Sequence, residues 1–170
     1  MIVPIEIQNK ISKYMYNLID VINIYDQSKN HQMEIKITNL YSINKKELKK
    51  LTQNIIEQQK FKNVEKLDAK NNEKIENVNH MKKTLKILNS SSYHCGINQS
   101  GILELNLIEL YACRNSKIKN VNHMKRTLKI FDCSENCGID QYGISELNLL
   151  KLYAENNFKI INVKNVGKIY

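Results

Sequence analysis

Several signals that would assign the chain to a common class are missing from its 170 residues. No run of 18 apolar residues occurs, which argues against a transmembrane helix. Pro4, Glu6 and Gln8 stand where a signal peptide would carry an apolar segment, so we expect an intracellular protein that binds no membrane. The chain has no GxSxG, Walker or Rossmann pattern, and we therefore expect no catalytic residue, no enzymatic activity and no cofactor.

Arginine and tryptophan are scarce as well. The chain has no Trp, and only 2 Arg accompany 24 Lys, although the formal net charge is +9. Because Arg is the side chain suited to bidentate phosphate binding, its scarcity argues against nucleic acid as a partner. Asn and Ile also occur 24 times each. We attribute this bias to an AT-rich coding sequence.

A repeat of 21 or 22 residues is the main feature that is present. It runs from Val64 onward in five units, 64–84, 85–106, 107–127, 128–148 and 149–170. Position 1 of each unit is Val or Leu, position 4 is Leu or Phe, position 6 is small, and an Ile closes the motif. Position 9 is Asn in four units, at Asn72, Asn115, Asn136 and Asn157.

This pattern resembles the leucine-rich-repeat family over residues 64–170, because such repeats have periods of about 20–29 residues. We therefore predict an α/β solenoid, an array of short parallel strands in which neighbouring units share a continuous core. Positions 4 and 6 lie on the same side of a strand and should point inward. The resemblance further implies that the Asn residues at position 9 form a ladder that hydrogen-bonds the backbone of the turns.

Odd and even units differ, so the duplicated module is a pair of about 43 residues. Even units contain Cys-Gly-Ile, at Cys95–Ile97 and Cys137–Ile139, followed by a later Gly-Ile. Odd units contain Asn-Val-Asn-His-Met, at Asn77–Met81 and Asn120–Met124. Four of the five Gly occupy the even-unit positions. We predict that they serve turns with positive φ or a close approach between backbones.

Cysteine and histidine follow the repeat and form no metal-binding pattern. Cys95 and Cys137 lie two units apart, about 10 Å at a strand spacing of about 4.8 Å. This distance exceeds the disulfide limit of about 7 Å. No CxxC occurs. His80 and His123 share one repeat position, so we assign them to packing or hydrogen bonding in a turn. We expect structural thiols and no metal.

Residues 1–32 are expected to form a small helical head. Pro4 suits the first turn of a helix, and apolar residues recur at helical spacing from Ile7 to Leu18. A second short helix is expected at Leu18–Tyr25. The order Pro-x-Glu-Ile, Ile, Tyr-Met and Leu-x-x-Val resembles a shortened F-box.

The two resemblances together imply an F-box/leucine-rich-repeat protein. In that family the head docks on the adaptor of a cullin-type ubiquitin ligase and the repeats bind a protein substrate. The adaptor contacts would then be Pro4, Ile5, Ile7, Ile11, Leu18 and Val21. The composition is similar to that of repeat proteins of giant DNA viruses, which implies host proteins as substrates and the host cytoplasm as the location. The alternative is a ligase-independent scaffold whose head only caps the solenoid.

Residues 33–63 are expected to form an irregular first coil. Met33–Tyr41 alternates as a strand with Ile35 and Ile37 inward, and Lys45–Phe61 has the apolar spacing of an amphipathic helix. At the other end, the fifth unit shows no polar capping helix. Because solenoids normally need terminal caps for solubility, this end is a candidate for self-association.

The predicted partner-binding surface is the concave face, made by positions 3, 5 and 7 of each unit. These positions carry three cations and four anions, so the face is near neutral. Its mixture of Tyr, Ile and isolated charges suits a protein partner. The residues expected to contact that partner are Ile87, Tyr111, Ile130, Asp132 and Tyr153. The excess Lys, at Lys82–Lys83 and Lys125–Arg126, is expected to be a solvated stripe, whereas a nucleic-acid binder would show steep salt dependence.

Overall fold

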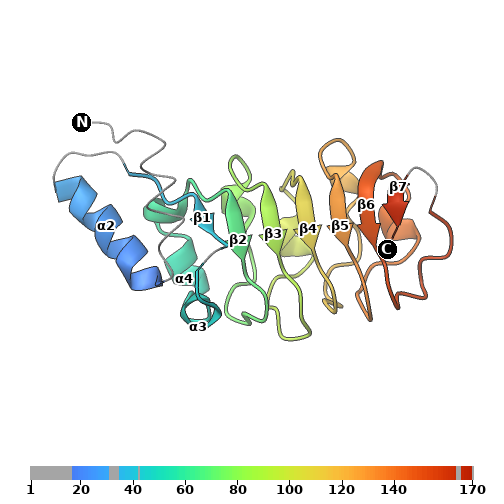
Figure 1. The fold of residues 1–170 in the computed structure, drawn as a ribbon, viewed down its shortest axis with the longest axis horizontal. Helices are drawn as coiled ribbons and strands as arrows, with labels where there is room; N and C mark the ends of the chain where they lie inside the picture. Colours follow the sequence, from blue (N-terminus) through green and yellow to red (C-terminus); the bar gives the residue numbers. More distant parts are fainter. Residues whose placement is uncertain (1–16, 31–34, 42, 164–165, 170) are drawn as a thin grey trace.

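One open sheet of seven parallel strands organises the protein (Figure 1). The computed structural model describes residues 17–30, 35–41, 43–163 and 166–169. The order of strands in the sheet follows the chain, so neighbours in sequence are neighbours in space and the coils have a solenoid-like arrangement. The strands are β1 (Asn39–Leu40), β2 (Lys66–Asp68), β3 (Ile87–Asn89), β4 (Glu109–Tyr111), β5 (Ile130–Asp132), β6 (Leu149–Tyr153) and β7 (Val166–Ile169).

Short helical turns connect the strands and lie behind them in Figure 1. Those within the repeats are the 3-10 turns η2 (Asn79–Met81), η3 (Ser100–Ile102), η4 (Asn122–Met124) and η5 (Tyr142–Ile144). Before the repeats come α2 (Leu18–Asn30), α3 (Lys45–Leu48), α4 (Gln53–Ile56) and η1 (Gln59–Phe61). Among the described residues, no helix has the length and apolar character needed to span a membrane.

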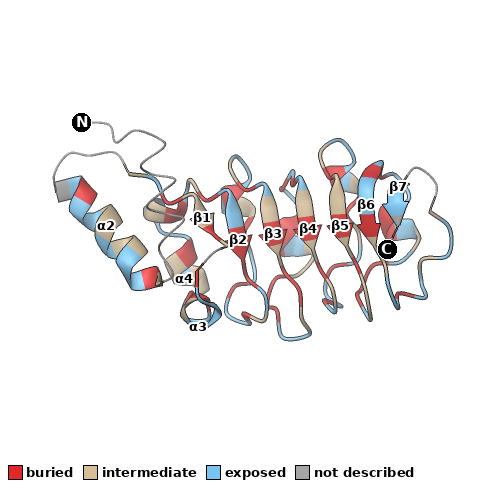
Figure 2. Ribbon diagram, viewed as in Figure 1, coloured by how far each residue is buried: buried red, intermediate tan, exposed pale blue. Residues whose placement is uncertain are grey.

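The residues at position 4, together with Leu40 before the repeats, form a continuous buried row through the core, and Figure 2 shows a buried segment, coloured red, on each of the neighbouring strands β2 to β6. The strand register aligns each with the next, and all are fully buried: Leu40, Leu67, Leu88, Leu110, Phe131 and Leu152. The small side chains of position 6 are buried too, at Ala69, Ser90, Ala112 and Cys133. The predicted inward orientation of both positions is confirmed. Since each strand is short, a coil gains its stability by stacking on its neighbours.

A second row satisfies the backbone of the turns that follow the strands. The side-chain amide of Asn115 donates to the carbonyl oxygens of Ser90 (2.8 Å) and Ile97 (3.0 Å) in the preceding coil. Its Oδ1 accepts from the backbone N–H two residues further on, at 3.0 Å. Asn72 and Asn157 make equivalent bonds and are also buried. The predicted asparagine ladder is confirmed at Asn72, Asn115 and Asn157, which all belong to odd units.

The even units continue this row with cysteine. Cys95 Sγ donates to the carbonyl oxygen of Ala69, at position 6 of the preceding unit (3.5 Å), and Cys137 Sγ accepts from the backbone N–H of Ile139 (3.5 Å). Both thiols are buried. The prediction that Asn136 belongs to the ladder is wrong, because Asn136 is exposed and the adjacent Cys137 takes its place. A thiol can fill this position because it both donates and accepts, although weakly.

Glycine allows the even coils to approach the odd coils closely. A Cβ on Gly96 would lie 2.5 Å from the carbonyl oxygen of Glu73, and one on Gly101, Gly138 or Gly143 would overlap a backbone oxygen of the preceding coil. No described glycine has positive φ, so close approach is the correct one of the two predicted roles. Positive φ occurs instead at position 8 of every unit, at Asn71, Ser92, Arg114, Glu135 and Asn156.

Glutamine joins the coils at a third place. Oε1 of Gln99 accepts from the backbone N–H groups of Lys119 (2.8 Å) and Asn120 (2.9 Å), while its Nε2 donates to the carbonyl oxygen of Asn120 (2.9 Å). Gln53 makes the same three bonds to the first repeat, and Gln141 accepts two N–H groups of the last coil. Each of these side chains stands in for a backbone partner that a coil cannot supply to itself.

The first coil differs from its prediction. Among the described residues of Met33–Tyr41, only Asn39–Leu40 form a strand, and Ile37 is buried as expected whereas Ile35 is partly exposed. The helix predicted at Lys45–Phe61 is divided into α3, α4 and η1. The division has a physical reason: the carbonyl groups of Leu48 and Leu51 accept the amide of Asn72 (2.9 and 3.0 Å), so the chain turns there.

β7 is a strand that the repeat did not predict. It lies inside the predicted fifth unit and pairs in parallel with β6, with Ile169 opposite Leu152. Ile169 follows Leu152 by 17 residues, whereas Leu152 follows Phe131 by 21. The segment 149–170 therefore contains two strands joined by a shortened coil.

Replacing Asn115 with Ala should destabilise the protein strongly. The change leaves two buried carbonyl oxygens unsatisfied, and each such group costs about 1–3 kcal/mol. We expect the free energy of unfolding to fall by about 2–4 kcal/mol in urea titrations followed by circular dichroism. The control, Asn136→Ala, alters an exposed side chain and should change it by less than about 0.5 kcal/mol. Equal losses in the two variants would contradict the place of Cys137 in the ladder.

Gly138→Ala should also destabilise the fold. The new methyl group would overlap the backbone oxygens of Ile118 and Ser116, which cannot move independently of their coil. We expect a loss of about 1–3 kcal/mol, as for other overpacked sites. Gly167→Ala is the comparison, since its Cβ would meet its nearest neighbour, the carbonyl oxygen of Leu150, at 3.0 Å. A loss at Gly138 no larger than at Gly167 would argue against close coil contact.

Candidate functional site

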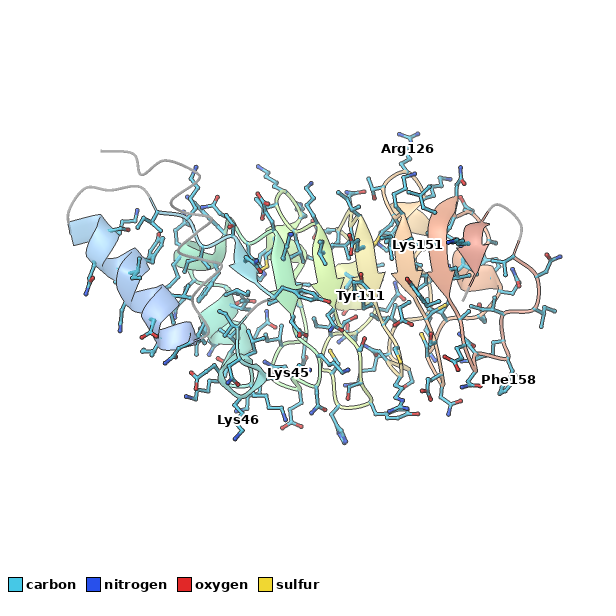
Figure 3. All side chains as sticks on the ribbon, viewed as in Figure 1. Lys45, Lys46, Tyr111, Arg126, Lys151 and Phe158 are labelled. Carbon is cyan, nitrogen blue, oxygen red and sulfur yellow. The ribbon has the colours of Figure 1, made fainter. Side chains whose placement is uncertain are left out.

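Outward-facing side chains form two adjacent rows on the sheet, one from position 3 and one from position 5. We call the surface made by positions 3, 5 and 7 of the five units the strand face. The strand register brings all five predicted partner-binding residues onto the two rows, each partly exposed: Ile87, Tyr111, Ile130, Asp132 and Tyr153. In Figure 3 Tyr111 lies near the middle of the row of strands and Lys151 lies nearer its C-terminal end.

Position 5 also has a structural role. Oδ1 of Asp132 accepts from the backbone N–H of Ser134 at 3.0 Å. Asp68 and Asn89, at the same position of other units, bond their own chain two residues further on at 2.9 and 3.1 Å. Such local bonds favour a turn at the end of a strand. Asp132 therefore ends β5 and at the same time contributes a negative charge to the strand face.

Tyr111 is the large aromatic side chain at the centre of the strand face. Its hydroxyl donates to Oε2 of Glu109 at 2.8 Å. Burial and this carboxylate raise the pKa of Tyr111 well above its usual value of about 10, so the phenol stays protonated and donates. The ring borders a hollow of about 200 Å³ whose lining includes Tyr41, Lys66 and Ile87. Sequence reasoning missed Tyr41, because it precedes the repeats and only the pairing of β1 with β2 brings it here.

A larger groove of about 610 Å³ lies at the C-terminal ends of β2 to β5, and we call it the strand-end groove. Its lining comes from positions 5, 7, 8 and 9 of four consecutive units: Lys70, Asn71, Asn89, Ser91, Ser92, Tyr93, Tyr111, Cys113, Arg114, Asp132 and Glu135. Tyr111 borders both hollows. Positions 5 and 7 were expected on this surface, whereas positions 8 and 9 were not. Position 8 is distinguished by its positive φ. The residue types there do not reveal that conformation, because none of them is glycine.

Opposite charges lie at the two ends of the strand-end groove. Lys70 follows β2 at one end and Asp132 ends β5 at the other. Arg114 forms an ion pair with Glu135 at 2.7 Å. Cys113 lies between the ends, and burial, Asp132 and Glu135 raise the pKa of its thiol against the opposing effect of Arg114 and Lys70. The thiol is therefore mostly protonated, and a poor nucleophile, at neutral pH.

The two histidines of the odd-unit motif, His80 and His123, have structural partners. All four cysteines are free thiols, as expected, and the described part of the chain contains no His, Cys, Asp or Glu group arranged to hold a metal ion. Nε2 of His80 lies 3.2 Å from the carbonyl oxygen of Ile56, and Nε2 of His123 lies 3.1 Å from that of Ile102. The predicted hydrogen-bonding role of both histidines is confirmed. Burial lowers the pKa of His123.

The helix α2 directs apolar side chains toward the repeats. Leu18 is 5% exposed and belongs to the core, and Val21 is partly buried against that core. Asp26 of the same helix forms an ion pair with Lys60 of η1 at 3.4 Å. The other predicted adaptor contacts, Pro4, Ile5, Ile7 and Ile11, lie outside the described residues.

The last coil leaves apolar side chains in contact with solvent. Phe158 and Ile161 are 86% and 85% exposed, and Figure 3 shows Phe158 at the C-terminal end of the array. A hollow of about 330 Å³ nearby is lined in part by Ile144, Leu147 and Val163. Self-association through this end stays a prediction.

Cys113 should react slowly with iodoacetamide at pH 8 and faster as the pH rises. The raised pKa reduces the thiolate fraction at any given pH, and Asp132→Asn should lower that pKa and speed the reaction. Asn preserves the turn, since Asn89 occupies the same position in β3. Alkylation rates from pH 7 to 10, followed by peptide mass spectrometry, test this, with buried Cys95 as the internal control. An unchanged rate in Asp132→Asn would contradict the placement of Asp132 beside the thiol.

The geometry offers a surface for binding: two rows of mixed apolar and charged side chains, a central tyrosine, and a groove with opposite charges at its ends. Comparison with known proteins found no match among family models, curated proteins or solved structures.

Proposed function

We propose that this chain is a leucine-rich-repeat recognition module that binds a protein partner through the strand face. One observation carries the proposal. The outward rows present Ile87, Tyr111 and Ile130 partly exposed beside the strand-end groove, on a side of the sheet that the described segments leave open (Figure 1).

The chemistry of this face suits a protein partner better than a nucleic acid. Tyrosine is enriched among the residues that dominate binding energy at protein interfaces, and Tyr111 stands at the centre of the face between two hollows. Charges of both signs are interspersed, as Lys66, Glu109 and Asp132 illustrate. A phosphate backbone would instead favour a continuous positive surface.

We infer that α2, the described helix of the head, serves mainly as a cap on the first coil. Leu18 lies in the core, Val21 packs against it, and the ion pair of Asp26 with Lys60 joins α2 to η1. Apart from Ile19, which is 52% exposed, the exposed side of α2 is polar. These contacts favour a ligase-independent binding module over adaptor docking through this helix.

The second candidate is a substrate receptor of a host cullin-type ubiquitin ligase. The F-box-like pattern from Pro4 to Val21 supports it, and Ile7 and Ile11 would then contact the adaptor. The strand face would bind the host protein to be ubiquitinated, and the chain itself would transfer no ubiquitin. Both candidates use the strand face and differ only in the role of the head.

Affinity capture with three forms of the protein tests the strand face. Immobilised wild type, the face variant Tyr111→Ala/Ile130→Ala and the control Arg126→Ala are incubated with a eukaryotic cell extract, and captured proteins are quantified by mass spectrometry. A genuine partner should be retained by wild type and control, and the face variant should bind it at least about tenfold more weakly in titrations. Circular dichroism establishes that all three are folded. A partner that binds the face variant as well as wild type would refute the proposed surface.

The same captures decide the role of the head. If the head docks on a ligase, the cullin adaptor should be captured by wild type and lost from a folded Ile7→Asp variant, while strand-face partners remain bound. A folded wild type that captures no adaptor leaves the binding-module candidate alone.

A further inference from the structure

We propose that the strand-end groove binds an extended peptide segment that carries an acidic side chain and, about four residues away, a basic one. The inference rests on the proposed function and specifies the chemistry of the partner. Three observations carry it: the dimensions of the groove, the charges at its two ends and the polar groups of its floor.

The groove has the length of a short extended peptide. It crosses the ends of β2 to β5, which are three strand spacings apart, or about 14 Å at about 4.8 Å for each spacing. An extended chain advances about 3.3 Å per residue, so about four residues span this distance. A volume of about 610 Å³ accommodates such a segment with its side chains partly in solvent.

The two ends of the groove call for opposite charges on the occupant. Among the described residues, no carboxylate lies within ion-pair distance of the Lys70 ammonium group, and no cation lies within that distance of Asp132. Asp68, which ends β2, interacts with Lys70 beyond that distance, but it is buried and does not line the groove. Glu135 differs, because Arg114 offsets its charge at 2.7 Å. The end at β2 therefore favours an acidic side chain and the end at β5 favours a basic one.

The floor of the groove supplies a polar group that lacks a protein partner. Ser91 is only 6% exposed. Its backbone N–H donates to Asn89 Oδ1 (3.1 Å) and its carbonyl oxygen accepts from Asn71 N (3.1 Å). Within the described ranges, no hydrogen bond reaches its hydroxyl. A buried hydroxyl is costly unless it is hydrogen-bonded, and a peptide backbone brings both N–H and C=O groups to such a floor.

A peptide fits this groove better than a small molecule or a nucleic acid. Pockets for small molecules are predominantly apolar, whereas this lining is largely polar, with Tyr111 as the main apolar wall. The carboxylates of Asp132 and Glu135 disfavour a phosphate chain. An extended peptide can instead place its middle side chains against Tyr111 and its backbone over Ser91.

Selection from a phage-displayed library of random twelve-residue peptides tests the inference on the intact protein. We expect the enriched peptides to share an acidic and a basic residue about four positions apart, and their affinities are then measured by fluorescence anisotropy. Two variants reverse or remove the charge at one end of the groove. Each introduces a residue that occurs at the same position of another unit. Lys70→Glu copies Glu155 at position 7, and Asp132→Asn copies Asn89 at position 5.

Lys70→Glu should weaken the enriched peptides at least about tenfold and select peptides with a basic residue at both places. Asp132→Asn should remove the preference for the basic residue. Ser91→Ala should weaken all of the peptides without changing their charge preference. Lys83→Glu, outside the groove, is the matched control and should change nothing. Circular dichroism confirms that each variant is folded.

The outcomes separate this inference from the proposed function. Enriched peptides that lose binding in Tyr111→Ala but share no pair of opposite charges would overturn the inference and leave the proposed function intact. A failure to enrich any peptide, or salt-sensitive binding of an oligonucleotide in place of peptides, would also overturn it. If affinity capture also finds no partner that depends on the strand face, the proposed function fails as well.

Discussion

The stack of coils depends on one recurring hydrogen bond, from a side chain of one coil to a backbone carbonyl of the coil before it. A strand of three residues followed by a turn leaves carbonyl groups that its own coil cannot satisfy, and burying them unpaired is costly. Asn115 and Asn157 donate an amide to the position 6 carbonyls of Ser90 and Cys133. In an intervening even unit the thiol of Cys95 makes the corresponding bond. Because these bonds align the turns, they also align the buried row of position 4 side chains inside and the strand face outside.

The sequence was sufficient to predict the inward and outward sides of the strands but insufficient to predict the turns. Leu88 and Leu110 recur at a fixed spacing, and strand alternation then decides what faces outward. Asn136 and Cys137 are adjacent and either can hydrogen-bond, so only the turn geometry decides between them. Position 8 was missed because its occupants share a backbone conformation and no common chemistry. The groove depends on that conformation.

Position 5 separates the stability of the fold from the specificity of the surface. Asp68, Asn89 and Asp132 each use one side-chain oxygen to end their strand. Exchange between Asp and Asn therefore changes the charge of the strand face and leaves the turn intact. Tyr111 and Tyr153 show that a tyrosine is also accommodated there. The surface can thus diverge while the row beneath it stays constant.

The glycines of the even coils set the size of the step by which this architecture can be lengthened. Gly96 and Gly138 fit against carbonyl groups of the odd coil before them, where a side chain would collide. An even coil is therefore shaped to lie on an odd one, and a single inserted coil would place two coils of the same kind in contact. Tandem duplication during evolution would preserve the contacts only in whole pairs. Each such event adds about 10 Å of sheet, so the footprint available to a partner would grow in discrete increments.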